Sequence, residues 1–273
     1  MSSSTEGAVS LRKRLSRFTR HYRLMARTNW PLGRLSSLRD SKRGRRAFLL
    51  GNGPSLRDLD LGRLAGEDVC VVNMGVRALE NGLPNVAIHV VIDKNRYLRF
   101  ADEIEDFASR YGIPLRFFGI WVKSTWRRRR IRAQEPYYLF LERRRYLETG
   151  FREAPQRGYG NCGTVIITAL QILYYLGYRE VYVAGVDLNY SGEQTYFYDL
   201  GSADRVHEAD PLVQQRRPLM NEADAEFALA LAAYERDGRK LVNVGAGGKL
   251  AALPREDYNQ VLARPGGAHG GHS

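Results

Sequence analysis

The stretch Gly51-Asn52-Gly53-Pro54-Ser55-Leu56 follows directly after the apolar run 47–50, Ala-Phe-Leu-Leu. An apolar strand that ends in two glycines around a polar residue predicts a sharp turn with accessible backbone N–H groups. In an α/β sheet such a turn lies at the carboxyl edge, where ligands bind. The turn therefore predicts a nucleotide site, although it matches neither the P-loop nor the G-x-G-x-x-G spacing. A tight turn without a ligand is the alternative.

Outward from this turn, short apolar segments alternate with helical patterns. The alternation predicts an α/β fold that is Rossmann-like and doubly wound, with a mainly parallel sheet. The expected strands are Ala47–Leu50, Val69–Asn73, Ala87–Ile92, Leu115–Ile120, Glu180–Ala184 and Lys240–Val244, and the expected helices are Gly75–Asn81, Tyr97–Tyr111, Thr164–Leu176 and Met220–Arg236.

The chain of 273 residues is 44% hydrophobic, which suits one large core with extensions. We expect a basic N-terminal helical arm over residues 1–44 and a nucleotide-binding catalytic domain over residues 45–264. Polar insertions at 121–160 and 189–218 are expected to form an inserted lid region. The Gly- and His-rich tail 265–273 is expected to be disordered.

The positive charge is concentrated in the arm. Residues 1–46 hold 13 Lys and Arg against two acidic residues, which accounts for nearly all of the net +12. An apolar stripe at helical spacing predicts a basic amphipathic helix that lies on an anionic membrane surface. Packing of the stripe on the domain and nucleic-acid binding are the alternatives. The stripe consists of Leu11, Leu15, Phe18, Tyr22 and Met25.

Two further features bear on where the protein works. No run of about 20 apolar residues is present, so we expect no segment that spans a bilayer. Cys70 and Cys162 lie in apolar segments, which favours a reducing compartment over a disulfide. We therefore expect a cytoplasmic protein, peripheral on the inner membrane face, with no specific nucleic-acid partner.

Polar residues follow several of the predicted strands. Asn73 and Asp93 end two of them, and the carboxyl ends of parallel strands meet at one edge, so both are candidate ligand-binding residues. Helix N-capping is the alternative for each. The turn Asn161-Cys162-Gly163-Thr164 precedes an apolar helix, and N–H groups at a helix start can bind a phosphate. The alternative there is an ordinary turn that Asn161 caps.

The segment after residue 184 carries the remaining candidates. Asp187 is a candidate for a helix cap, a ribose contact or a metal ligand. Tyr190 and Tyr196 carry hydroxyls that can donate to a departing phosphate. His207, close to Glu208, has a titration range suited to a general base. An exposed loop histidine is the alternative.

The turn Gly51–Leu56, Asn73 and the block Leu176–Asp187 together resemble one superfamily. It contains bacterial sialyltransferases that use CMP-activated sialic acid, flagellin nonulosonate transferases and 6-hydroxymethylpterin diphosphokinase-like proteins. The resemblance covers roughly residues 45–262. It implies a glycosyltransferase that moves a sugar from a CMP-activated donor to a cell-surface glycan or lipid-linked acceptor and requires no cofactor.

The resemblance also implies roles for single residues. The nucleotide would bind Asn52, Asn73 and the turn 161–164, Tyr190 and Tyr196 would lie near the leaving phosphate, and His207 would be the general base. The donor sugar, the acceptor and whether the chain forms a homo-oligomer stay open. The full set of expected binding residues is Gly51, Asn52, Gly53, Pro54, Ser55, Asn73, Asp93, Asn161, Cys162, Gly163, Thr164 and Asp187, with no metal ligand.

Two other functions stay open. Asp93 and the ending Asn243–Tyr258 look like the diphosphokinase branch, which implies an ATP-dependent diphosphotransferase with Mg²⁺ held by Asp93 and Asp187. Arginine runs interleaved with aromatic residues at 121–146 suit a phosphate backbone, so an RNA-binding scaffold is the third possibility. Its alternative is a solvated lid.

Overall fold

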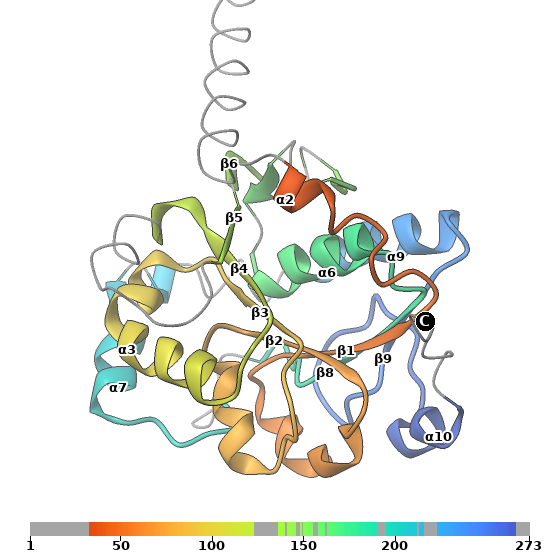
Figure 1. The fold of residues 1–273 in the computed structure, drawn as a ribbon. Coiled ribbons are helices and arrows are strands. Elements are labelled where there is room, and N and C mark those ends of the chain that lie inside the picture. Colours follow the sequence, from red (N-terminus) through yellow and green to blue (C-terminus); the bar gives the residue numbers. More distant parts are fainter. Residues whose placement is uncertain are drawn as a thin grey trace, which may run out of the picture.

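The computed structural model describes residues 33–122, 136–139, 141–145, 148, 150–154, 158–161, 163–189, 195–211, 213–215 and 223–265. Within these ranges the chain forms a seven-stranded sheet with helices on both faces (Figure 1). Neighbouring strands in this sheet are parallel throughout. The expected α/β fold with a mainly parallel sheet is therefore confirmed.

The order of the strands explains where a ligand can bind. The sheet runs β5-β4-β3-β2-β1-β8-β9, so the chain first builds outward from β1 in one direction and later adds β8 on the other side. The order reverses between β1 and β8, and open α/β sheets bind ligands at such a switch point. The strands are β1 (Arg46–Leu50), β2 (Asp68–Val72), β3 (Ile88–Val91), β4 (Leu115–Gly119), β5 (Tyr137–Leu139), β8 (Glu180–Ala184) and β9 (Lys240–Asn243); β6 (Leu141–Arg145) and β7 (Tyr159–Asn161) form a separate parallel pair.

Side chains alternate between the two faces along each strand, and each face has its own core. Ala47 and Leu49 of β1 pack beneath α6, α9 and α2, whereas Phe48 and Leu50 face α3, α10 and the 3₁₀ helices (Figure 1). The helices are α2 (Gly33–Ser36), α3 (Lys94–Arg110), α6 (Val165–Leu176), α7 (Ser202–Glu208), α9 (Asp224–Arg236) and α10 (Tyr258–Ala263), and the 3₁₀ helices are η1 (Pro54–Asp58), η2 (Leu61–Leu64), η3 (Asn73–Asn81) and η4 (Ile120–Val122).

Helix α6 shows how local sequence fixes an element. Thr164 caps its start, since its Oγ1 accepts a hydrogen bond from the N–H of Ile166 at 3.3 Å. Gly177 ends it in the left-handed conformation at φ 91°, where a glycine has no Cβ to clash. Its residues are apolar on nearly all sides because the sheet and α9 cover it.

The structure differs from the sequence expectation in the insertion 121–160. Tyr137–Leu139 forms β5, an edge strand that pairs with β4, so part of this insertion belongs to the main sheet. A strand of three residues is too short for its alternation to stand out within an arginine-rich stretch. The arginine run 127–130 and the residues 190–194 of the second insertion lie outside the described residues.

The described end of the N-terminal arm packs on the domain. Leu35 is buried, and the N–H groups of Asp40 and Lys42 donate to the carbonyls of Tyr175 and Leu176 at 3.0 and 2.7 Å. Residues 33–44 therefore lie against the end of α6. The apolar stripe of the arm and the tail beyond residue 265 fall outside the described residues. In the part of the chain that is described, no helix combines the length and apolar character needed to cross a membrane.

Candidate active site

The turn after β1 is held closely against the end of β8. The N–H of Gly51 donates to Ala184 and that of Gly53 to Gly185, both at 2.8 Å. A Cβ on Gly51 would lie 2.2 Å from the Gly185 carbonyl oxygen. Gly53 has a φ of −68°, which any residue adopts. These glycines are therefore required because the chain at the end of β8 approaches them. The expectation of accessible N–H groups is wrong for both glycines, because each N–H already donates to a backbone carbonyl.

Asp187 fastens this turn. Its carboxylate accepts hydrogen bonds from the N–H of Ser55 at 2.9 Å and from the Ser55 hydroxyl. A Cβ on Gly53 would lie 2.4 Å from the same carboxylate. Pro54 is the first residue of η1, where its missing N–H costs no hydrogen bond. The structure thus shows Asp187 holding the turn after β1, a role that the sequence did not indicate, and its contact with a ribose stays a prediction.

Asn52 and Asn73 bring two polar side chains to the ends of β1 and β2. Nδ2 of Asn52 donates to the Val72 carbonyl at 3.2 Å, and the Asn52 carbonyl accepts from the N–H of Phe197. The Oδ1 atoms of both asparagines are buried and have no hydrogen-bond partner among the described residues. An unpaired buried oxygen is costly, and a ligand that donates N–H or O–H groups would satisfy it.

A second cluster follows β3. Asp93 caps α3, since its carboxylate accepts from the N–H groups of Asn95 and Arg96 at 2.9 and 3.1 Å. This is the capping alternative. The buried Arg96 guanidinium pairs with Glu208 at 2.9 Å and donates to the Tyr196 hydroxyl at 3.1 Å. The Tyr196 hydroxyl itself donates to Glu208 at 2.7 Å.

The electrostatics of this cluster keep its groups in one protonation state. Burial opposes the charge of Arg96, but Tyr196, Tyr198 and Glu208 raise its pKa above the usual value. Burial raises the pKa of Tyr196 well above its ordinary value and that of Tyr198 to about 12. Both tyrosines therefore keep their protons at neutral pH and can donate hydrogen bonds.

His207 lies in α7 and is only 1% exposed, so it is not the exposed loop histidine that the sequence left open. Its ring meets Phe100 edge-on, with centroids 6.5 Å apart. Burial lowers the pKa of His207 and Arg96 lowers it further, whereas Asp93 and Glu208 act in the opposite direction. The imidazole is therefore neutral near pH 7. Its Nδ1 has no hydrogen-bond partner within the described ranges.

The predicted phosphate site at the start of α6 is arranged differently. The N–H of Gly163 donates to the buried carboxylate of Glu226 in α9, at 3.0 and 3.3 Å to its two oxygens. Thr164 serves as the helix cap. A protein carboxylate thus already accepts from one N–H group that was expected to face a phosphate. Cys162, Tyr190 and the side chain of Asn161 lie outside the described residues.

The two clusters are joined by the loop at 195–199. Besides the bond from Phe197 to Asn52, Arg57 of η1 pairs with Asp199 at 2.9 Å. Arg77 lies 4.6 Å from the Tyr198 ring centroid and pairs with Asp204 of α7. Sequence reasoning missed Arg96, Arg77 and Glu226. A basic residue in the first turn after a strand end was the available signal for Arg96.

The sheet order bears on the metal-dependent alternative. Asp93 follows β3 and Asp187 follows β8, and three strand spacings separate these strands, roughly 14 Å. Both Asp187 oxygens already accept from Ser55. Among the residues that the structure describes, no group of three His, Cys, Asp or Glu side chains could hold a metal ion. Both carboxylates thus already accept hydrogen bonds from protein groups, and Mg²⁺ binding by Asp93 and Asp187 stays a prediction.

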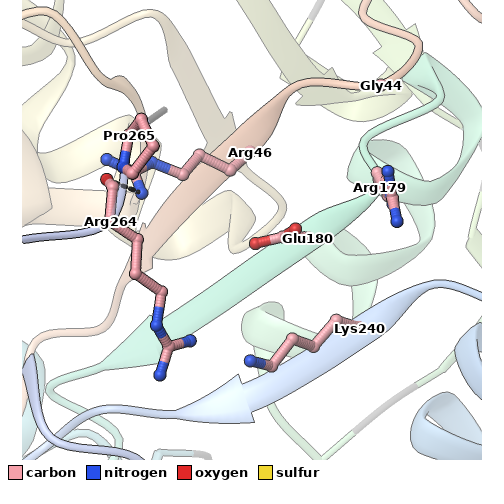
Figure 2. A pocket seen from close by; sticks show the side chains of 7 residues that line it. All are labelled: Gly44, Arg46, Arg179, Glu180, Lys240, Arg264 and Pro265. Atoms are coloured by element: carbon pink, nitrogen blue, oxygen red, sulfur yellow. Dashed lines mark hydrogen bonds between the residues drawn. The ribbon is translucent and has the colours of Figure 1, made fainter. Parts of the chain in front are cut away.

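A pocket of about 200 Å³ lies at the opposite, amino edge of the sheet (Figure 2). Arg46, Glu180 and Lys240, the first residues of β1, β8 and β9, line it. Arg46 pairs with Glu67, and Lys240 pairs with Glu256. These carboxylates neutralise much of the local positive charge, and the pocket is remote from the strand ends that carry the candidate site.

The comparisons with known proteins agree with this architecture. The sialyltransferase CstII from Campylobacter jejuni, solved in complex with the substrate analogue CMP-3FNeuAc, superimposes with a TM-score of 0.54 at 14% identity, over 79% of this chain and 87% of that chain. The chain therefore has the α/β fold of a bacterial sialyltransferase, and the resemblance found in the sequence is confirmed at the level of fold.

More distant likenesses include the sialyltransferase Cst-I from Campylobacter jejuni, with a TM-score of 0.49 at 14% identity over 77% of this chain and 80% of that chain. The MAf glycosyltransferase from Magnetospirillum magneticum AMB-1 gives 0.46 at 15% identity over 86% of this chain. This chain spans only 38% of the length of that protein. No protein-family model and no curated protein sequence matches.

Proposed function

We propose that the protein is a glycosyltransferase of the sialyltransferase type, which moves a sugar from a CMP-activated donor to an acceptor hydroxyl. The observation that carries this proposal is the pair of unpaired, buried Oδ1 atoms on Asn52 and Asn73, at the carboxyl ends of adjacent strands. The amino group of a cytosine and the hydroxyls of a ribose are donors that such oxygens accept. The fold shared with CstII supports the same assignment.

The reaction requires the protein to position the two substrates and to transfer protons. Displacement at the anomeric carbon forms a bond from the acceptor oxygen and breaks the bond to the nucleotide phosphate. The neutral imidazole of His207 takes the acceptor proton, because its depressed pKa leaves a basic nitrogen at neutral pH. The protonated hydroxyl of Tyr196 donates to Glu208 in this structure, and it must turn away from Glu208 to donate to the leaving phosphate, where it adds no charge. Since His207 is buried beside Phe100, α7 must shift when the acceptor enters.

The acceptor and the location complete the proposal. We propose a cell-surface glycan or a lipid-linked glycan as acceptor, and an anionic inner membrane face as the place of work. The basic N-terminal arm supports this, since an amphipathic helix rich in arginine and aromatic residues binds anionic headgroups. Transfer without a metal is part of the same proposal, and turnover in excess EDTA tests it.

The test of the general base compares His207→Ala with the wild-type chain. We expect the variant to bind CMP with an unchanged Kd, because Asn52 and Asn73 are intact, and to lose transfer by about 10²-fold or more. Phe100→Leu is the matched control, since it alters the packing beside the imidazole and leaves the base in place. Equal turnover by His207→Ala and the wild type would exclude the general-base role.

A further inference from the structure

His89 is a polar residue in the interior of the sheet. It lies in β3, is fully buried, and packs edge-on against Phe118 with ring centroids 5.7 Å apart. Its Nε2 lies 2.7 Å from the carbonyl oxygen of Asn73. Because a carbonyl oxygen only accepts, Nε2 carries the proton and donates. Nδ1 of the same ring carries the lone pair in this tautomer and has no hydrogen-bond partner among the described residues.

The charge state of His89 keeps Nε2 a hydrogen-bond donor. Burial lowers the pKa of His89 to about 3, the hydrogen bond to Asn73 opposes this, and Arg116 lowers the pKa again. The ring is therefore neutral throughout the range in which enzymes usually work. A neutral donor at a fixed tautomer gives a hydrogen bond that does not switch with pH.

Asn73, the acceptor, has an unusual backbone conformation. Its φ of 48° places it in the left-handed region, which most residues with a Cβ avoid and which asparagine enters more readily than they do. Such strained residues persist only where their surroundings hold them, and they gather at functional sites. At this residue the chain leaves β2 and enters η3, and its side-chain Oδ1 is one of the two unpaired acceptors of the candidate nucleotide site.

We propose that His89 is a positioning residue of the nucleotide site, whose N–H holds the Asn73 carbonyl and thereby keeps the Asn73 side chain turned toward the ligand. The proposal rests on the function proposed above for the ligand itself. Asn52 is held by a different carbonyl, since its Nδ2 donates to Val72, the last residue of β2. Loss of His89 therefore removes one of the two acceptors and leaves the other.

Two substitutions distinguish the effect of the His89 hydrogen bond from the effect of its ring. His89→Phe keeps a planar ring beside Phe118 and removes the donor, whereas His89→Gln places an amide N–H near the position of Nε2 and keeps it. We expect His89→Phe to raise the Kd for CMP about tenfold and His89→Gln to leave it within about twofold of the wild type. His89→Asn, whose amide is too short to reach, replaces the Phe variant if that variant does not fold.

A double-mutant cycle shows whether His89 acts through Asn73. Asn73→Gly removes the side chain and the strain together, so adding His89→Phe to it should not raise the Kd further. Calorimetric titration of the full chain with CMP gives all four constants. A His89→Phe variant with the wild-type Kd, or equal effects of that substitution in both backgrounds, would overturn the proposal.

The backbone of Asn73 provides a measurement that needs no ligand. A crystal structure of His89→Phe should show Asn73 outside the left-handed region, and one of His89→Gln should show it inside. If the wild-type chain binds no CMP, the proposed function fails. These two structures still show whether His89 holds the Asn73 backbone in the left-handed region. A positive φ retained in the Phe variant would then refute it.

Discussion

The close contact between Gly51 and β8 makes one substitution informative. A Cβ at residue 51 would lie 2.2 Å from the Gly185 oxygen, 2.9 Å from its carbonyl carbon and 2.9 Å from the Val186 side chain. Ordinary contact begins near 3.4 Å, so the main chains after β1 and β8 must separate by about 1 Å. The nearest atoms belong to the Gly185 backbone, so no flexible side chain can move aside to relieve the closest contact.

The cost of Gly51→Ala follows from these contacts. Overpacking of this kind costs about 1–3 kcal/mol. The separation also weakens the hydrogen bonds from Gly51 to Ala184 and from Gly53 to Gly185, each worth about 1 kcal/mol net. We therefore expect the free energy of unfolding to fall by about 4 kcal/mol, and Tm by roughly 8–16 °C for a domain of this size.

Thermal melting followed by circular dichroism measures this effect. Gly247→Ala is the matched control, because its Cβ would find only the Ser55 Cβ at 3.7 Å and its φ is not in the left-handed region. The control should melt within about 2 °C of the wild type, as neutral surface substitutions do. If Gly51→Ala melts as late as the control, the glycines of the turn do not serve the approach of β8.

Asp187→Asn should weaken CMP binding and lower stability, because the amide cannot accept from both Ser55 donors. An unchanged Kd for CMP by calorimetry would show that the contact between Asp187 and Ser55 does not support the binding site. Arg96→Met should raise the pKa of His207 and move the acid limb of the kcat/KM profile to higher pH, whereas Arg96→Lys should move it less; a limb that stays in place contradicts this. The folded-state pKa values of His89 and His207 are both lowered, so stability falls as pH drops below about 6.5, and His89 accounts for about 2 kcal/mol at pH 5. Urea unfolding should show that the free energy of unfolding falls less between pH 7 and pH 5 in His89→Gln than in the wild type. An equal fall in both would contradict the contribution assigned to His89.

The sequence predicted most of the sheet because its strands are short apolar runs bounded by polar residues. The strand expected at Glu180–Ala184 is found with those bounds, and the one expected at Lys240–Val244 ends one residue earlier. Strand ends followed by Asn52, Asn73 and Asp93 could be located for the same reason. Their roles as ligand-binding residues stay predictions.

Other features depend on contacts between distant segments and could not be predicted. The pairing of Arg96 with Glu208 joins residues 112 positions apart, and nothing in the local pattern around either residue indicates it. The carboxylate of Glu226 at the start of α6 comes from a helix 63 residues further along the chain. The sequence left open whether His207 is a general base or an exposed loop histidine, because its burial by Phe100 and α3 is a tertiary effect.

The central claim is that the carboxyl ends of β1 and β2 bind a cytidine nucleotide without a metal. Thermal melting of the full chain with CMP, CDP, UDP, GDP and ATP, each with and without Mg²⁺, tests it most directly. A ligand at a hundredfold excess over its Kd stabilises the folded state by about 2.7 kcal/mol, which is readily measured. We predict a rise in Tm with CMP that is the same in EDTA and in Mg²⁺. A rise only with ATP and Mg²⁺ would contradict the claim and favour a diphosphotransferase.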